Sequence, residues 1–147
     1  MPRHTKKSTV NRIIDANINR TKEGLRVCEE ITRFILNSRS LTLEFKKFRH
    51  EIDSALLGLV ARSKLLRERL AREDVGQSIY GNELKREGLK DIFFANIQRV
   101  KESIRVLEEF SKLIDVNAAL RFKRARYKIY AIEKKAARRI LALRSLG

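Results

Sequence analysis

A helix-forming stretch that occurs twice in the chain constrains the fold more than any other feature. Residues 15–31 read DANINRTKEGLRVCEEI, and residues 94–110 read FANIQRVKESIRVLEEF. Ten of the sixteen pairs from Ala16/Ala95 to Ile31/Phe110 are identical. In both copies apolar residues recur at steps of three and four, the period of an amphipathic helix. The sequence therefore predicts two related helices.

Each of these helices is followed by a second repeated segment. Residues 45–52, FKKFRHEI, align with residues 122–129, FKRARYKI. The first helix is expected to start near a cap at Ser8, Thr9 or Asn11 and to end near Asn37, with Ser40 capping the next helix. Two helices joined by so short a turn pack as an antiparallel hairpin. The repeated unit is then a helical hairpin, with Asn117 as the cap of its last helix.

Two such hairpins predict an all-α fold, a four-helix bundle in which the copies are related by a pseudo-two-fold axis. With 147 residues, 43% of them hydrophobic, the chain is expected to form one domain, residues 1–147. Repeat one spans about 11–60, a connecting segment about 61–82, and repeat two about 83–147. In the connection, residues 63–73 are expected to be helical, and Gly81 or Asn82 to start the next long helix.

Polar residues stand at matching positions of the two predicted apolar stripes. The first stripe runs through Ile13, Gly24, Cys28 and Ile35, and the second through Ile92, Ser103, Leu107 and Ile114. Each carries the pattern Asn-x-x-Arg-x-x-Glu: Asn17, Arg20 and Glu23, then Asn96, Arg99 and Glu102. Burying Asn or Arg costs several kcal/mol unless each finds a partner. The two sets are thus either a binding site for a small polar ligand or a buried ion network that fixes the register of the helices.

The chain is strongly basic, with 34 Lys and Arg against 18 Asp and Glu. Residues 121–147 alone contain ten basic residues and one acidic residue. Such a field attracts nucleic acid, an anionic membrane surface or phosphorylated metabolites, or it is a solvated Lys/Arg-rich surface. No apolar run is long enough to span a membrane and no signal region follows the amino end, so a cytoplasmic protein is expected.

Several kinds of site are excluded by what the sequence lacks. It contains no G-x-x-x-x-G-K-[ST], no G-x-G-x-x-G and no H-E-x-x-H. One Cys and two His cannot form a disulfide or a zinc site, and Cys28 is interpreted as a core thiol rather than a nucleophile. His50 is expected to be exposed. Arg26 and Arg105 are expected to form surface ion pairs with Glu30 and Glu109. Asp74 is interpreted either as a metal-binding carboxylate or as a helix stop, with Gly76 in the left-handed region.

Four segments together resemble a known family: residues 12–27, residues 48–51 (FRHE), residues 74–76 (DVG) and residues 95–110. They look like a helical family of the thiamin pathway whose members occur alone or fused ahead of thiamine phosphate synthase. The resemblance implies a hydroxymethylpyrimidine phosphate kinase, which moves the γ-phosphoryl group of ATP onto the substrate phosphate. It implies a small phosphorylated pyrimidine as substrate, with ATP and Mg²⁺ as cofactors.

Under this resemblance the polar residues of both copies receive roles. Arg20, Arg99, Arg49 and Arg126 would hold phosphates, and Asn17 or Asn96 would pair with the aminopyrimidine. Glu23, Asp74 and Glu102 are the candidate catalytic carboxylates, of which Asp74 and Glu23 are the candidate Mg²⁺ ligands.

Two other functions stay open: a basic helical nucleic-acid-binding protein, and an interaction module without catalysis. Apolar residues left over at Leu65, Leu66 and Leu70 also allow a homodimer.

Overall fold

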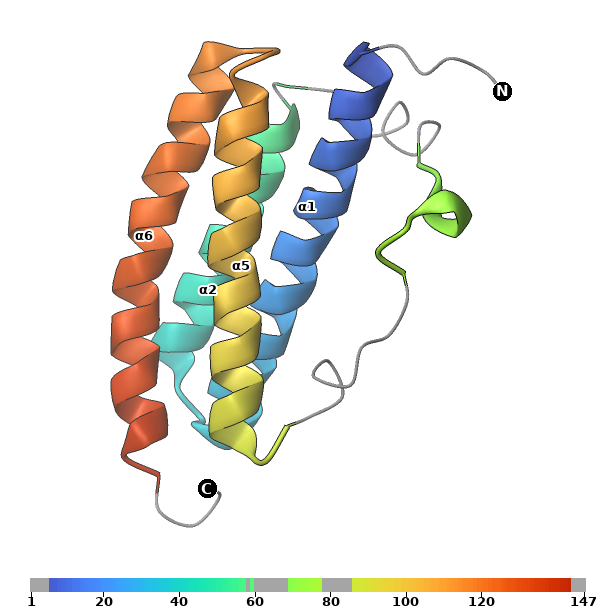
Figure 1. Cartoon of the computed structure of the whole chain (residues 1–147). Helices are drawn as coiled ribbons and strands as arrows, with labels where there is room; N and C mark the ends of the chain where they lie inside the picture. The colour runs from blue at the N-terminus through green and yellow to red at the C-terminus, as the bar shows by residue number, and fades with distance from the viewer. Residues whose placement is uncertain (1–5, 58, 60–68, 78–85, 144–147) are drawn as a thin grey trace.

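The computed structural model describes residues 6–57, 59, 69–77 and 86–143. These residues form four long helices and no strand: α1 (Lys6–Glu30), α2 (Arg39–Leu57), α5 (Leu89–Ser111) and α6 (Val116–Leu141). The helices lie side by side as a four-helix bundle, with consecutive helices running in opposite directions in each hairpin (Figure 1). The all-α bundle predicted from the two repeated hairpins is confirmed, whereas the pseudo-two-fold axis and the domain limits stay predictions.

The core of the bundle is made by one apolar face of each helix. Its largest fully buried side chains include four phenylalanines from α2, α5 and α6, namely Phe45, Phe48, Phe93 and Phe122. On α1 the buried face runs through Val10, Ile14, Ile18 and Leu25. This face is rotated from the predicted stripe, because Arg20 and Ile35 are exposed. Because α1 packs against both α2 and α5, it buries a wider part of its circumference than the predicted stripe. The middle of this buried face also lies at a different angle around the helix.

α1 and α5 approach closely at Gly24. A Cβ atom built on Gly24 would lie 2.7 Å from Val100 Cγ2 and 2.9 Å from the carbonyl oxygen of Asn96. One turn away, the Thr21 and Ser103 hydroxyls are 2.6 Å apart. In the repeat, Thr21 is equivalent to Val100, and Gly24 to Ser103. Gly24 of copy one thus contacts the copy-two equivalent of Thr21, and Thr21 contacts the copy-two equivalent of Gly24.

The helix ends differ from the predicted ones in their caps. Ser38, not Ser40, caps α2, since its Oγ accepts a hydrogen bond from the amide of Leu41 at 3.3 Å. Asp115, not Asn117, caps α6 by accepting from the amide of Asn117 at 2.9 Å. α1 already includes Ser8, Thr9 and Asn11, so these three residues are not its caps. Cap-forming residues cluster at both turns, and the choice between neighbours depends on backbone geometry.

The α1–α2 turn lies close to its predicted place. α1 continues into a π-helical turn at Ile31–Ile35, and Asn37 follows in the left-handed region with φ of 49°. Asn tolerates this conformation better than most residues. The reversal at Asn37 places Ser38 at the start of α2 and confirms the expected end of the first helix.

The segment between the hairpins is mostly not helical where it is described. Only Ala71–Glu73 forms a short 3-10 turn, η2, so the prediction of a helix up to Glu73 is wrong for residues 69 and 70. Gly76 does not have a positive φ, so the left-handed helix stop is also wrong. The long helix of repeat two begins at Leu89 rather than at Gly81 or Asn82, which lie with residues 60–68 outside the described residues. Within the described helices, none has the length and apolar character needed to cross a membrane.

Candidate functional site

A polar pocket of about 790 Å³ lies between the amino-terminal part of α1, the carboxyl-terminal half of α5 and the segment 69–76. This segment runs alongside α1 in Figure 1. The pocket contains four arginines and three carboxylates: Arg12, Arg20, Arg69, Arg99, Asp15, Glu23 and Asp74. Val106 and Phe110 give it an apolar wall. A pocket with this lining fits a ligand that carries phosphate groups and a small ring.

Five of the predicted site residues meet at this pocket: Asn17, Arg20, Glu23, Asp74 and Arg99. They come from both copies of the repeat and from the connecting segment. Arg20 and Arg99 are exposed, although both stand on the predicted apolar stripes. For Arg20 the reason is that the buried face of α1 is rotated away from it. Their guanidinium groups are therefore open to a ligand from solvent.

Asn17 supports Arg20 from within the helix. Asn17 is buried, and its Nδ2 donates to the carbonyl oxygen of Ile13 at 2.8 Å. This bond turns Oδ1 outward, where it accepts from Arg20 Nη1 at 3.3 Å. The Asn-x-x-Arg part of the motif thus orients the arginine. No closed Asn-Arg-Glu ion network forms, because the described contacts give no ion pair between Arg20 and Glu23.

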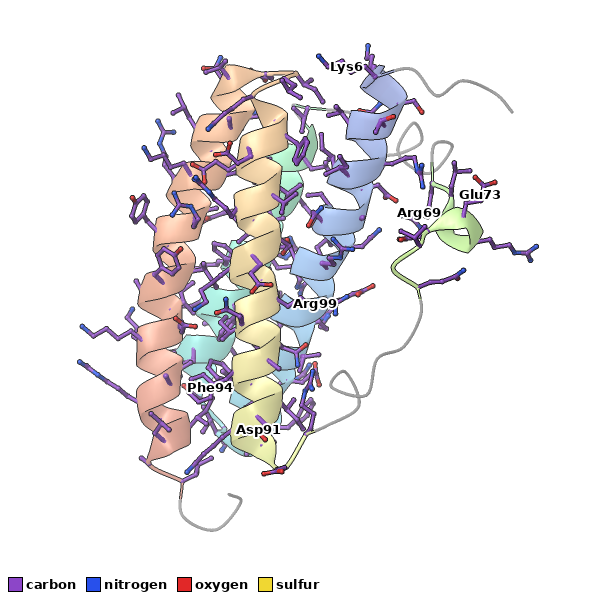
Figure 2. All side chains as sticks on the ribbon, viewed as in Figure 1. Lys6, Arg69, Glu73, Asp91, Phe94 and Arg99 are labelled. Atoms are coloured by element: carbon purple, nitrogen blue, oxygen red, sulfur yellow. The ribbon has the colours of Figure 1, made fainter. Side chains whose placement is uncertain are left out.

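A carboxylate that the sequence analysis did not single out anchors the segment 69–76 to α1. Asp15 is buried, and it receives two hydrogen bonds of 2.6 Å from Nε and Nη2 of Arg69. This hydrogen bonding to Asp15 raises the pKa of Arg69. Arg69 points from the segment toward α1 in Figure 2. The one sequence signal was the repeat itself, which has apolar Phe94 where copy one has Asp15.

Two predicted residues of the second copy are not among those that line this pocket. Asn96 Nδ2 donates to the carbonyl oxygen of Ile92 at 2.7 Å, as Asn17 does in its own helix. Glu102 is exposed and accepts from Gln98 Nε2 at 3.0 Å. Their predicted roles are therefore not supported by this pocket.

The two predicted phosphate-binding residues Arg49 and Arg126 are instead partners of buried glutamates. Arg126 Nε donates to Glu108 Oε2 at 2.8 Å, and Arg49 Nε lies 3.4 Å from Glu29 Oε2. Burial raises the pKa of Glu108, but the hydrogen bonds from Arg126 and then Arg105 outweigh it, so this pKa lies below its usual value. The same bond raises the pKa of Arg126. These pairs join each hairpin's two helices.

The surface arginines also differ from their predicted pairing. Arg26 Nη1 lies 3.5 Å from Glu29 Oε2, one residue before the expected partner Glu30. Arg105 lies 3.2 Å from Glu108 and 3.2 Å from Glu109, so its predicted partner is confirmed alongside a second one. The sequence did not mark Glu29 and Glu108 as buried.

The pocket carboxylates are the candidates for binding a divalent cation. Asp74 Oδ1 accepts the amide hydrogen of Gly76 at 2.8 Å, which leaves its other oxygen for a ligand. No cluster of three or more His, Cys, Asp or Glu residues is found among the described residues. Mg²⁺ is commonly held by one or two carboxylates plus substrate phosphates, so Asp74 and Glu23 fit that smaller donor set.

Cys28 and His50 lie where the sequence analysis placed them. Cys28 is fully buried, and burial, with a smaller contribution from Glu133, raises the pKa of its thiol to about 12. A thiol of this kind is not a nucleophile at neutral pH. His50 is exposed.

Comparison with known proteins links this chain to a named family. The model of the ThiD2 family matches residues 12–135. The thiamine-phosphate synthase of Nostoc punctiforme is 40% identical over 128 residues, which cover 84% of this chain and 34% of that protein. The synthase of Synechocystis sp. is 39% identical over 127 residues, covering 86% and 36%, and that of Rhodopirellula baltica is 40% identical over 124 residues, covering 84% and 33%.

This chain spans about a third of the length of these curated relatives. No solved structure gives a significant match. The family match covers most of α1, all of α2 and α5, and most of α6. It therefore includes every residue of the pocket except Thr9. With its helical bundle and its sequence similarity over this range, the chain belongs to the ThiD2 family, which links it to thiamin biosynthesis.

Proposed function

We propose that this protein phosphorylates hydroxymethylpyrimidine phosphate with ATP, and that the reaction takes place in the pocket between α1, α5 and the segment 69–76. The observation that carries the proposal is the gathering of four arginines and two solvent-facing carboxylates, Glu23 and Asp74, in one pocket. Phosphoryl transfer depends mainly on positioning and on neutralising charge, which such a set of residues supplies.

The role of each residue follows from its surroundings. Arg20, held by Asn17, and Arg99 approach the pocket from two different helices and are exposed. They bind the phosphate groups of the two substrates, since guanidinium groups bind phosphate in a bidentate manner. The apolar side chains Val106 and Phe110 pack against the pyrimidine ring. Asn17 acts by orienting Arg20 rather than by touching the pyrimidine.

Glu23 and Asp74 would hold the Mg²⁺ ion that accompanies ATP. Held there, the ion would supply positive charge that offsets the charge developing on the transferred phosphoryl group. Asp74 is fixed by its bond to the Gly76 amide, and the segment that carries it is held to α1 by the Asp15–Arg69 pair. Asp15 and Arg69 are therefore positioning residues.

Among the described residues the proposed site is formed around copy one, although the sequence pattern occurs twice. In copy two, Asp91 replaces Arg12 and Phe94 replaces Asp15. Phe94 and Asp91 lie toward the opposite end of the bundle from the segment that carries Arg69 (Figure 2). Copy two therefore lacks the carboxylate that anchors this segment in copy one, while Arg99 still contributes to the site of copy one.

A coupled assay for ADP release tests the proposal, with Mg-ATP and hydroxymethylpyrimidine phosphate as substrates and the unphosphorylated alcohol as control. Arg20→Ala and Arg99→Ala should each lower kcat/KM by about 10²-fold, the usual cost of losing one preorganised charge-stabilising group. Arg138→Ala, which removes an exposed arginine of α6, should leave it unchanged. Absence of substrate-dependent turnover in folded protein would refute the proposal, and equal losses in all three variants would refute the residue roles.

The basic surface of α6 favours a second candidate function, nucleic-acid binding. Lys123, Arg124, Lys134 and Arg138 are exposed on this helix. Part of its charge is neutralised by α2, because Lys128 binds Glu51 at 2.7 Å and Lys135 binds Glu44 at 2.7 Å. Affinity for duplex DNA that falls steeply with salt and drops in a Lys123→Gln variant would support this function. The non-catalytic module is less favoured, since the Asn-Arg-Glu sets do not close on themselves and a pocket lies beside them.

A homodimer remains a further prediction. Leu65 and Leu66 lie outside the described residues, and Leu70 lines the pocket. Sedimentation equilibrium over a range of protein concentrations would measure the oligomeric state.

A further inference from the structure

A second polar pocket, of about 640 Å³, lies at the α1–α2 turn. It shares no lining residue with the first pocket. Its basic side chains come from the end of α1, from the π-helical turn Ile31–Ile35 and from α2: Arg26, Arg33, Arg39, Lys46 and Arg49. The α1–α2 turn lies at the end of the bundle far from the amino terminus of α1 (Figure 1). The proposed reaction site uses none of its residues.

The charges of this pocket are not balanced by its own residues. Among its described lining residues Glu29 is the single carboxylate, and it is already close to Arg49 at 3.4 Å and Arg26 at 3.5 Å. Arg39 and Lys46 form no ion pair within the described part of the chain, and Arg33 stacks over the Phe34 ring at 4.7 Å. Three exposed cations therefore line one pocket without a carboxylate partner of their own, and their combined positive potential attracts an anion from solution.

The second copy of the repeat shows that packing alone does not require this arrangement. There the buried Glu108 is again held by Arg126 and Arg105, so the buried ion pair is common to both copies. Lys112, the equivalent of Arg33, is paired with Glu109 at 2.9 Å. The cation at this position of the second copy is therefore matched by a carboxylate.

Two further positions at the turn also give copy one more positive charge than copy two. Copy two has Asp115 where copy one has Ser38, and Val116 where copy one has Arg39. Asp115 brings a negative charge to the start of α6, and Arg121 lies 4.0 Å from it. Copy one has instead a neutral cap and an added arginine. These two positions therefore make the α1–α2 turn more positive than the equivalent turn of copy two.

The backbone of this turn adds to the positive field. Asn37, with φ of 49°, reverses the chain so that the first turn of α2 faces the pocket, and Ser38 and Arg39 line it. The start of a helix carries a partial positive charge and amide hydrogens that point outward. The basic side chains and the start of α2 therefore both add positive potential to this pocket.

We propose that the pocket at the α1–α2 turn is a binding site for a polyphosphate anion, separate from the site of the proposed reaction. Arg39 and Lys46 bind the phosphate groups, whereas Arg26 and Arg49 remain paired with Glu29 beside the bound anion. Either free pyrophosphate or the triphosphate of a nucleotide offers this chemistry. The site does not depend on the proposed kinase activity, because no residue is shared between the two pockets.

Isothermal titration calorimetry with inorganic pyrophosphate and with ATP, both without Mg²⁺ and at a fixed salt concentration near 0.15 M, tests this site. The titrations use an Arg20→Gln/Arg99→Gln background, in which the first pocket has lost its two facing arginines. We expect one saturable site per chain. Tighter binding of ATP than of pyrophosphate would identify a nucleotide as the ligand, and equal binding would identify the free polyphosphate. Absence of saturable binding would overturn the proposal.

A matched pair of double variants distinguishes binding by the residues of this pocket from non-specific attraction to a basic protein. Arg39→Gln/Lys46→Gln should weaken binding by about tenfold or more, since two charge-assisted contacts are lost. Lys123→Gln/Lys134→Gln removes the same charge from α6, and Lys123 is the repeat equivalent of Lys46. This control should change the affinity by less than about twofold. Equal losses in both variants, or a duplex oligonucleotide that displaces pyrophosphate and is weakened equally by both, would overturn the site.

The amide signals of residues 37–39 give a structural readout. Pyrophosphate should shift these signals in the ¹⁵N–¹H NMR spectrum of the background protein and should not shift them in Arg39→Gln/Lys46→Gln. Circular dichroism of each variant checks that the bundle is retained. Shifts confined to the neighbourhood of Arg12 and Glu23 would place the anion in the first pocket and would also overturn the proposal.

Discussion

The Asp15–Arg69 pair gives a direct test of how the candidate site is held together. Arg69→Gln removes the two 2.6 Å hydrogen bonds to a carboxylate whose side chain is only 8% exposed. Each charge-assisted bond contributes about 1.5–3 kcal/mol, so the gross loss is about 3–6 kcal/mol. Because the Arg69 side chain is 40% exposed and Asp15 regains water when the segment leaves, we discount this to a net coupling of about 2 kcal/mol.

A double-mutant cycle measures this coupling. Urea unfolding of the wild-type protein, Arg69→Gln, Asp15→Asn and the double variant at pH 7 gives the interaction energy by difference. In a chain of this size about 2 kcal/mol corresponds to a fall in Tm of about 4–8 °C. Arg69→Lys should recover only part of the loss, because an ammonium group cannot form the two parallel bonds.

The Lys128–Glu51 pair is a suitable control for this cycle. Its N–O distance is 2.7 Å, close to that of Asp15–Arg69, but its side chains are 56% and 47% exposed. Exposed pairs contribute about 0.2–1 kcal/mol, so a smaller coupling is expected there. If the coupling of Asp15 with Arg69 is no larger than that of the control, burial of the carboxylate does not strengthen the contact, and the anchoring role that we assign to Arg69 is wrong.

Three further predictions concern the bundle itself. Gly24→Ala should lower the free energy of unfolding by about 1–3 kcal/mol despite the better helix propensity of Ala, because the new Cβ meets a carbonyl oxygen that cannot move aside; chemical denaturation measures this, and a gain in stability would contradict the close approach. The pKa of Glu108 is lowered in the folded protein, so ionised Glu108 contributes its full stabilisation of the fold above the ordinary value of 4.5. This stabilisation is lost as the pH falls through the lower pKa of the folded state. Urea midpoints measured from about pH 7 to about pH 3 should therefore fall less steeply in Glu108→Gln than in the wild-type protein. Cys28, with a thiol pKa of about 12, should resist iodoacetamide at pH 8 in the folded protein and react in urea, whereas fast reaction under native conditions would show that the thiol is accessible.

The sequence was a good guide to the helices because the helical period is a local property. Both repeated hairpins, the buried Phe45 and Phe48, and the buried Cys28 follow from spacing and side-chain type. The orientation of α1 was predicted less well, since Arg20 was placed on the apolar stripe of the helix and is exposed. The arc that a helix buries depends on which neighbours it packs against, and this information is not contained in its own periodicity.

The candidate site was predicted where it consists of residues on one helix face, and missed where it depends on distant contacts. Arg20, Glu23 and Arg99 were marked by their place in the repeat and line the pocket. The contact between Asp15 and Arg69 joins residues that are 54 positions apart, and no local pattern predicts such a pair. Arg49 shows the same limit, because its partner Glu29 lies on the other helix of its hairpin.

Comparison of the two copies separates what the fold requires from what a site requires. Both hairpins contain a buried glutamate held by an arginine from the neighbouring helix, Glu29 with Arg49 and Glu108 with Arg126. Removing one partner would leave an uncompensated buried charge in either hairpin, so the fold itself explains why both copies have the pair. No such reason applies to Asp15, because Phe94 occupies the same repeat position at partial exposure without disturbing α5. Copy one thus has a buried carboxylate at a position where the helix also forms with an apolar residue. This indicates that copy one uses Asp15 for its pocket, which is why we expect a single reaction site per chain.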